Sequence, residues 1–272
     1  MSRRGPGRRR GVEKRGRGKE RKERKHDSRY FVCGINALNQ LLESDPERLR
    51  ELYLKADLGR ERLSRISTDP KHMICPVHHV DDEELYRLAG TENHQGVVAS
   101  ITPPELLDDN AALELLEGIE NPLILILDSV HDPRNLGACL RTAEAAGADL
   151  VVVPRSRSPE LTPTVSKVAS GAAEIQKIAR VSNLARFLKE LQEAGVWLVG
   201  TDGDAEQSLF DQSLTQPVAL IMGAEGEGIR RLTREHCDLL VNLPLHGTVE
   251  SLNLSVAAGI GLYEILRQRG RT

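Results

Sequence analysis

Apolar strands alternate with helices along the second half of the chain, and this alternation constrains the fold more than any other feature. Residues 123–127 (LILIL) are a continuous apolar run, which is typical of a strand covered on both faces. The hydrophobic pattern predicts further strands at 149–153, 196–200, 217–222 and 238–243, and helices at 135–146, 182–194 and 252–268. Such alternation predicts βαβ units and therefore an α/β domain on a parallel sheet.

Polar or glycine-rich loops accompany several of these elements. Residues 223–228 (GAEGEG) follow a predicted strand, and 251–255 (SLNLS) precede the last helix. A third polar segment, 135–141 (NLGACLR), lies far upstream, and 200–203 (GTDG) ends another strand. Ligands of open parallel sheets bind beyond the carboxyl ends of the strands. We therefore expect these loops to converge on one pocket.

The glycine cluster is not a phosphate-binding loop. The chain has no G-x-G-x-x-G after its first apolar strand and no Gly-Lys-Ser/Thr sequence. Glu225 and Glu227 inside the cluster would repel a phosphate, so the loop favours a cationic or neutral ligand. Taken alone, the cluster is equally compatible with a turn in which glycines only relieve backbone strain.

A smaller α/β unit precedes this domain. The pattern predicts helices near 35–42, at 60–66 and at 81–88, with strands at 51–54 and 95–99. Gly118 and Pro122 frame the boundary with the larger domain. The predicted divisions are a basic arm at 1–28, a substrate-binding domain at 29–101, a linker with a helix at 102–121, and the larger domain at 122–272.

The net charge of −3 conceals a basic N-terminus. Residues 1–25 contain thirteen Lys and Arg against three Glu, a charge of +10, which leaves −13 for residues 26–272. A segment with so few apolar residues cannot form a core, so we predict that the arm is disordered. Its charge suits the phosphate backbone of a nucleic acid. A solubilising tail and a mitochondrial targeting peptide are the alternatives, although the three Glu disfavour the latter.

Composition limits the remaining classes. Aromatic residues make up 3% of the chain, which argues against base-stacking platforms. The four cysteines form no C-x-x-C pair, and His78, His79 and His94 lack partners at metal-ligand spacing. No apolar run approaches the roughly 18 residues that span a membrane. We therefore expect no metal, no membrane segment and a reducing cytoplasmic location.

Three motifs in order carry a specific resemblance. Asn135-x-Gly137-x-x-x-Arg141, Gly223-x-Glu225-x-x-Gly228 and residues 251–255 resemble the motifs of the SpoU/TrmH family of SPOUT RNA methyltransferases. The resemblance spans 123–268, and the N-terminal unit is similar to the RNA-binding domain of longer members. It implies S-adenosylmethionine as cofactor, a deep trefoil knot, a homodimer, and methylation of a ribose 2′-hydroxyl.

Among the longer members, the resemblance implies a guanosine of 23S rRNA as the target. A tRNA or another rRNA is an alternative target, since the motifs do not identify the base. A non-catalytic RNA-binding or ribosome-assembly factor is a different class. The intact set of polar motif residues argues against it.

The resemblance assigns individual residues to the site. It implies catalytic roles for Asn135, Arg141, Glu225, Ser251 and Asn253, and cofactor contacts for Thr201, Gly203, Gly223, Leu243 and Leu252. Glu225 is expected to pair with Arg141. Simpler explanations remain for several residues: Asn135 or Ser251 as helix caps, Arg141 paired with Glu144, and the leucines as ordinary core.

Overall fold

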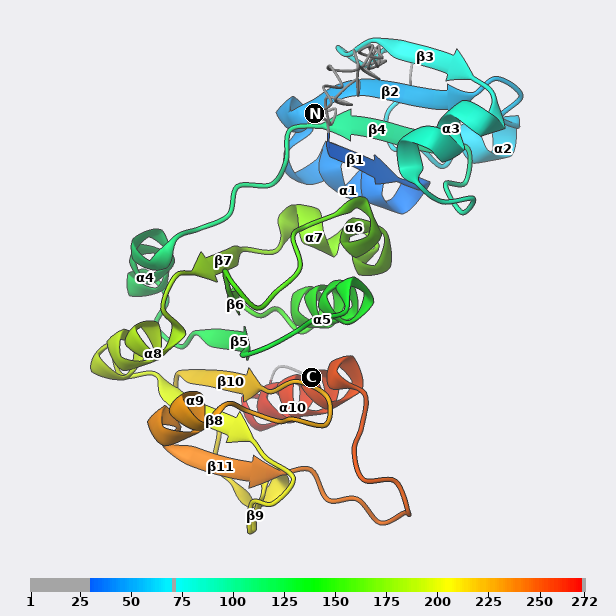
Figure 1. Cartoon of the computed structure of the whole chain (residues 1–272). Coiled ribbons are helices and arrows are strands. Elements are labelled where there is room, and N and C mark those ends of the chain that lie inside the picture. Colours follow the sequence, from blue (N-terminus) through cyan, green and yellow to red (C-terminus); the bar gives the residue numbers. More distant parts are fainter. Residues whose placement is uncertain (1–29, 70–71, 271–272) are drawn as a thin grey trace, which may run out of the picture.

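Two β-sheets organise the chain. The computed structural model describes residues 30–69 and 72–270, and the predicted basic arm lies outside them. A four-stranded sheet has the order β1-β4-β2-β3, and a seven-stranded sheet has the order β7-β6-β5-β10-β8-β11-β9 (Figure 1).

The four-stranded sheet and its helices form the N-terminal unit. Its strands are β1 (Tyr30–Cys33), β2 (Leu49–Lys55), β3 (Val77–Val80) and β4 (Val97–Ile101); its helices are α1 (Ile35–Ser44), η1 (Pro46–Arg48), α2 (Arg60–Leu63) and α3 (Asp82–Ala89). Strand β4 is antiparallel to β1 and β2, and β3 is parallel to β2. The Asp81 side chain caps α3 by accepting from the Glu84 N–H, and Gly90 at φ 65° ends it.

The seven-stranded sheet is parallel throughout. Its strands are β5 (Leu123–Leu127), β6 (Leu150–Pro154), β7 (Ile178–Val181), β8 (Trp197–Thr201), β9 (Gln207–Ser208), β10 (Val218–Met222) and β11 (Leu239–Asn242). The helices are α4 (Asp109–Glu117), α5 (Pro133–Ala145), α6 (Pro163–Ala169), α7 (Ala172–Ile175), α8 (Leu184–Glu193), η3 (Leu209–Asp211), α9 (Arg231–His236) and α10 (Leu254–Gln268). Because the strands are parallel, the loops after them meet at one edge.

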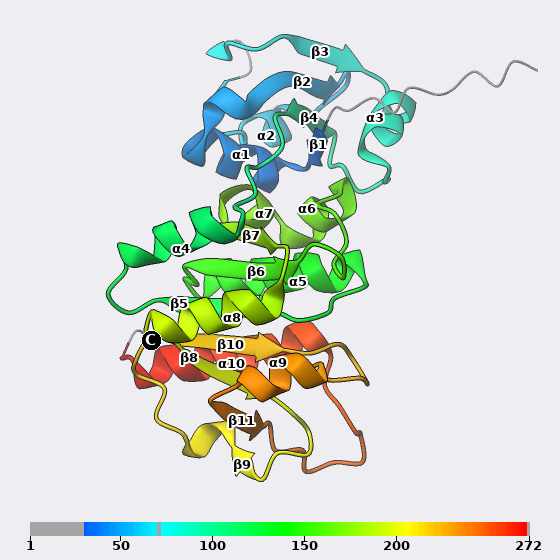
Figure 2. The same cartoon turned by 60° about the vertical axis from the view of Figure 1, so that its left-hand side comes forward.

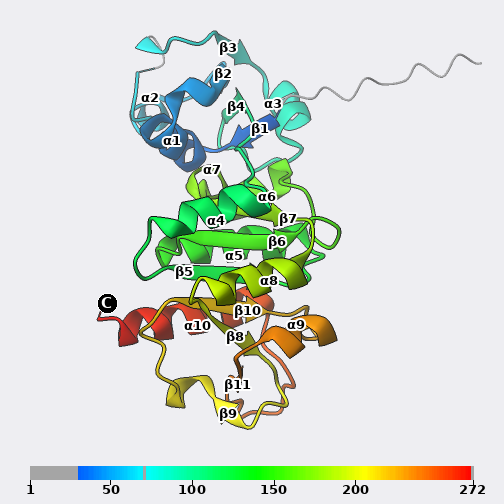
Figure 3. The same ribbon diagram turned by 90° about the vertical axis from the view of Figure 1, so that its left-hand side faces the viewer.

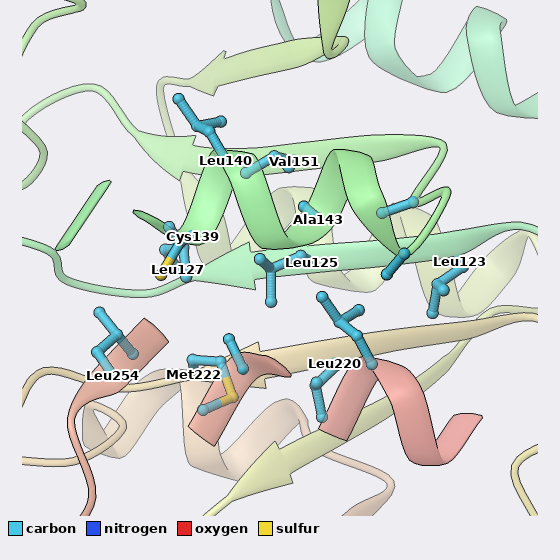
Figure 4. Close-up of a cluster of buried hydrophobic side chains, with 14 of the residues drawn as sticks. Leu123, Leu125, Leu127, Cys139, Leu140, Ala143, Val151, Leu220, Met222 and Leu254 are labelled. Carbon is cyan, nitrogen blue, oxygen red and sulfur yellow. The ribbon is translucent and has the colours of Figure 1, made fainter. Parts of the chain in front are cut away.

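Helices cover both faces of this sheet, as the continuous apolar strands predict. Alternate residues of β5 separate into two buried clusters: Leu125 packs with α5 and α10, whereas Ile124 packs with α4 and α8. Figures 2 and 3 show these helix pairs on opposite sides of the strands. Figure 4 shows the first cluster, to which β5, α5, β10 and α10 all contribute. The predicted α/β fold with a parallel sheet is confirmed.

A buried polar chain joins the two units. The Tyr30 Oη and Ser166 Oγ atoms are 2.6 Å apart, and the Ser166 hydroxyl donates to Glu174 at 2.7 Å. Arg48 pairs with the same carboxylate at 2.8 Å, and the Glu174 side chain is fully buried. Burial raises the pKa of Glu174 above its usual value, against the opposing effects of Ser166 and Arg48.

No helix in the described part of the chain is long and apolar enough to span a membrane.

Candidate functional site

Three polar side chains from distant segments meet at the carboxyl edge of the large sheet. The Glu225 Oε1 atom accepts hydrogen bonds from Asn135 Nδ2 (3.1 Å), from Asn253 Nδ2 (2.8 Å) and from the Leu254 N–H (3.0 Å). Asn253 Nδ2 also donates to Asn135 Oδ1 at 3.0 Å. The loop after β10 and the starts of α5 and α10 are thereby fixed to one another.

The loop after β10 is tightly folded. A Cβ atom on Gly223 would lie 2.0 Å from the carbonyl carbon of Gly228, so no other residue fits without moving the backbone. Ala224 and Gly228 exchange backbone hydrogen bonds of 3.1 and 2.9 Å, and Gly226 and Gly228 have φ values of 80° and 66°. The loop folds back on itself and presents Glu225 to the two asparagines.

A buried carboxylate that the sequence analysis missed anchors the end of this loop. Asp128, directly after β5, is fully buried and accepts from the Arg230 N–H at 2.8 Å and from Arg230 Nε at 2.7 Å. Arg230 Nη2 donates to the same carboxylate. Neither residue stands in the three motifs, so only the spatial neighbourhood of the strand ends reveals the pair.

A hollow of about 430 Å³ opens beside the polar cluster. All five residues expected to contact a cofactor line it: Thr201, Gly203, Gly223, Leu243 and Leu252. Glu225 and Ser251 line it as well, whereas Asn135, Arg141 and Asn253 do not. The hollow is formed by the loops after β8, β10 and β11, where the parallel sheet predicts a ligand site.

The hollow is acidic. Its lining includes five carboxylates against one arginine: Asp202, Asp204, Glu225, Glu227, Glu250 and Arg234. Arg234 is itself paired with Asp202 at 2.5 Å. The charge therefore favours a cation, as the sequence predicts. A phosphate group would meet net repulsion there.

The caps of the two site helices differ from the sequence-based expectations. Helix α5 begins at Pro133 and its cap is Asp132, which accepts from the Arg134 N–H, so Asn135 is free for the polar cluster. The cap of α10 is Asn253, which accepts from the Ser255 N–H at 3.0 Å. Asn253 was expected inside the first turn and Ser251 as the alternative cap. Ser251 instead lies exposed at the rim of the hollow.

Arg141 lies apart from the other motif residues. Within one chain the expected Arg141–Glu225 pair is not formed, and neither is the alternative pair with Glu144. Residues six apart on an α-helix differ by about 120° in direction, so Arg141 and Asn135 point from different faces of α5. Arg141 is exposed beside α1, and it has no ion pair or hydrogen bond with any residue in 30–69 or 72–270.

Cys139 is buried one helical turn from Asn135. Burial, together with the nearby Glu225 charge, raises the pKa of this thiol to about 12, so it stays protonated and unreactive near neutral pH.

Across the described ranges, no group of three or more His, Cys, Asp or Glu side chains is arranged to hold a metal ion.

Two family models match the chain, one over each unit. Residues 122–263 match the SpoU rRNA Methylase family. Residues 31–107 match the model described as RNA 2′-O ribose methyltransferase substrate binding. The two matches fall on the large sheet and on the four-stranded sheet respectively.

Full-length relatives and solved structures agree with these matches. The chain is 48% identical to the 23S rRNA (guanosine-2′-O-)-methyltransferase RlmB of Photobacterium profundum, over 89% of this chain and 99% of that protein. It is 49% identical to the protein of the same name from Pseudomonas putida, over 88% and 96%. The structure of an RNA 2′-O ribose methyltransferase matches with 27% identity and a TM-score of 0.74, covering 92% of both chains.

The fold is also that of AviRb from Streptomyces viridochromogenes, a SpoU methyltransferase solved with AdoMet (24% identity, TM-score 0.74, 93% and 96% coverage). The chain belongs to the SpoU rRNA Methylase family.

Proposed function

We propose that this protein transfers a methyl group from S-adenosylmethionine to the ribose 2′-hydroxyl of a guanosine in 23S rRNA. The observation that carries the proposal is the acidic hollow joined to the Asn135–Glu225–Asn253 cluster, in a chain almost half identical to enzymes named for that reaction.

The hollow fits the cofactor in shape and charge. Gly223 and Gly203 let backbone approach a ligand closely, and Leu243 and Leu252 supply apolar walls. The carboxylates around it favour a cationic ligand. When bound, S-adenosylmethionine supplies an electrophilic methyl group on a positively charged sulfur.

The polar cluster positions the reactants. Asn135 and Asn253 hold the Glu225 carboxylate, and the Leu254 N–H fixes it to the start of α10. The loop at the rim of the hollow is thereby set before substrate arrives, and correct positioning is a major part of the rate of such a transfer. Ser251 is exposed at the rim of the hollow, and its proposed role is to donate a hydrogen bond to the incoming ribose.

Arg141 acts on the substrate. A guanidinium keeps its proton because its pKa exceeds about 12, so it is a poor base. Arg141 instead holds a phosphate or stabilises the negative charge that develops on the 2′-oxygen as the proton leaves. Because Arg141 has no partner among the residues that the structure describes, all its donors are available for this role.

A second copy of the chain completes the site. Arg141 does not reach Glu225 of its own chain, and exposed apolar residues Val256 (51%) and Tyr263 (48%) lie on α10, which packs beside α5. A homodimer that buries these residues would bring Arg141 of one subunit to the hollow of the other. In a symmetric dimer the same contact forms twice.

The C-terminal path supports the proposed trefoil knot. β11 lies two positions beyond β10 in the sheet, yet the chain returns from it to pack α10 on α5 and β10. The segment 243–253 is proposed to thread the loop after β10 on this return. An experimental electron-density trace of this segment passing outside the loop would contradict the knot.

The N-terminal unit is proposed to select RNA, and the basic arm at 1–28 to add affinity. Deleting residues 1–25 should lower RNA affinity and flatten its dependence on salt, since fewer counterions would be released. If the salt slope is unchanged, the arm does not contact RNA.

The enzyme is proposed to act in the cytoplasm. Cell fractionation that recovers it elsewhere would contradict this.

The direct test is transfer of labelled methyl from S-adenosylmethionine to 23S rRNA and, separately, to tRNA. The wild-type protein should label 23S rRNA. Arg141→Ala should lose at least about 100-fold in kcat, as expected for loss of charge stabilisation in the transition state, while cofactor affinity measured by calorimetry stays unchanged. Labelling of tRNA alone would favour the tRNA alternative, and labelling of neither would favour a non-catalytic RNA-binding factor.

A further inference from the structure

We propose that the loop between β6 and α6, residues 155–162, binds backbone phosphates of the RNA strand that carries the target nucleotide. The loop is called the β6 loop below. This inference rests on the proposed function for the identity of the RNA, but it concerns a surface outside the motifs and the cofactor hollow.

The β6 loop lies at the same edge of the sheet as the site. Strands β5 and β6 are neighbours and parallel, so the segments that follow them run side by side. The Val130 N–H donates to the Arg157 carbonyl at 3.2 Å, which ties the β6 loop to the segment leading into α5. That helix carries Asn135 of the polar cluster.

The β6 loop carries two arginines without ion-pair partners against one carboxylate of its own, Glu160. Arg155 and Arg157 are exposed, and neither side chain forms an ion pair or hydrogen bond with another described residue. Arg134, in the first turn of α5, is likewise exposed, and its side chain has no partner among the described residues. In contrast, the exposed cations of α8 and α9 have carboxylate partners: Lys189 with Glu193, and Arg231 with Glu235.

A fourth arginine braces the backbone of the β6 loop. Arg180 of β7 donates through Nη2 to the carbonyls of Arg155 (3.0 Å) and Ser158 (3.4 Å). Arg180 and Arg155 line one small hollow together with Asp108 and Glu160, and a bound anion would add to the compensation that these two carboxylates give. The Arg180 Nε and the Ser158 Oγ atoms are buried without a partner in the described chain, so the loop also holds unused hydrogen-bond donors.

The position of the loop selects RNA as the anion. β6 is two strands from β10, which carries the Glu225 loop, so the two loops leave strands that are about 10 Å apart at a strand spacing of about 4.8 Å. A nucleic-acid strand advances about 3.4 Å per residue in a helix, so phosphates about three nucleotides from the target would reach the β6 loop. Planar guanidinium groups suit phosphate oxygens.

The test is the salt dependence of binding to transcribed 23S rRNA. The double variant Arg155→Ala/Arg157→Ala should reduce the slope of log Kobs against log salt by about 1.4, since each phosphate contact on single-stranded RNA contributes about 0.7. Cofactor affinity should be unchanged. The control Lys189→Ala/Arg231→Ala makes the same change in net charge at paired sites, and its slope should match wild type.

Three outcomes separate the possibilities. An unchanged slope in Arg155→Ala/Arg157→Ala contradicts the proposal, and an equal fall in the control shows an effect of overall charge and also contradicts it. If the alanine variant is unstable, Arg155→Lys/Arg157→Lys keeps the charges and should retain the wild-type slope; a slope lowered as far as in the alanine variant would overturn the proposal. Because binding is measured without methyl transfer, a wild type that binds but does not methylate 23S rRNA counts against the proposed function alone.

Discussion

At the scale of single residues, the site depends on one carboxylate oxygen that accepts three hydrogen bonds. Two of its donors are asparagine amides, and the third is a backbone N–H at the start of α10. Asn253 has two tasks there, because it both caps α10 and holds Glu225 and Asn135. The two tasks can be separated, since serine replaces asparagine well as a cap but has no amide.

The variant Asn253→Ser should therefore keep most of its stability and lose activity. We expect the free energy of unfolding to fall by no more than about 1 kcal/mol, because the cap survives and only the two amide hydrogen bonds of an exposed side chain are lost, while kcat falls by about 100-fold because Glu225 is no longer fixed. Urea unfolding and methyl-transfer kinetics measure the two effects. Asn183→Ser at the cap of α8 is the matched control, with unchanged kcat expected. If Asn253→Ser keeps the full kcat, Asn253 acts only as the cap of α10.

Gly223 is predicted to be irreplaceable for cofactor binding. A methyl group there would lie 2.0 Å from the Gly228 carbonyl carbon, so Gly223→Ala must displace the loop that forms the hollow. Affinity for S-adenosylmethionine, measured by calorimetry, should fall at least about tenfold, a loss of about 1.4 kcal/mol. Gly247→Ala, whose added carbon meets nothing within 4 Å, should bind as wild type does. If Gly223→Ala binds S-adenosylmethionine with wild-type affinity, the cofactor does not bind in this hollow.

At the scale of elements, the buried Arg48–Glu174 pair joins η1 of the N-terminal unit to α7 beneath it. The pKa of Glu174 is raised mainly by burial, so the folded protein binds this proton more tightly than the unfolded chain does. The stability contributed by the group is thus complete below the unfolded pKa near 4.3 and is lost as pH rises through the folded pKa.

Removing the arginine should enlarge this pH dependence. In Arg48→Met the carboxylate is buried without a cation, which should cost about 3–5 kcal/mol in the free energy of unfolding at pH 8. The loss should shrink at pH 5, because the raised pKa lets Glu174 take up a proton. Urea unfolding at both pH values checks this, with exposed Lys189→Met as a control that changes little at either. An equal loss at both pH values would contradict the account of Glu174.

The sequence predicts long elements better than short ones. The strands at 123–127 and 217–222 and the last helix are confirmed within two residues, because their apolar patterns are long and regular. Strands β1, β3 and β7 and helices α6, α7 and α9 were missed. These have four to seven residues, too few for a regular hydrophobic pattern, and contacts with other elements hold them: α6 packs on α5 and β1, and α9 packs on α8.

The sequence also identifies which residues meet more reliably than how they meet. Asn135, Glu225 and Asn253 do converge, and the five expected cofactor residues line one hollow. The expected pairing of Glu225 with Arg141 is not formed within one chain. The direction of the Arg141 side chain depends on the helical phase of α5. The Asp128–Arg230 anchor depends on strand order, which the hydrophobic pattern does not specify.

At the scale of the whole molecule, the proposed homodimer predicts that two inactive variants restore each other. Arg141→Ala retains an intact hollow, and Gly223→Ala retains an intact arginine. If each site uses Arg141 of one subunit and the hollow of the other, a mixed dimer contains one complete site. Random exchange of subunits at equal amounts should recover about a quarter of wild-type activity. Activity that stays at the level of the separate variants would mean that each site is built from one chain.

The proposed reaction of this protein is methylation of a guanosine ribose in 23S rRNA. Its most direct test is a map of 2′-O-methylation across the rRNA and tRNA of cells that lack the protein. One guanosine of 23S rRNA should lack its methyl group in those cells, and wild type but not Arg141→Ala should restore it. A 23S map identical to that of normal cells would contradict the proposal.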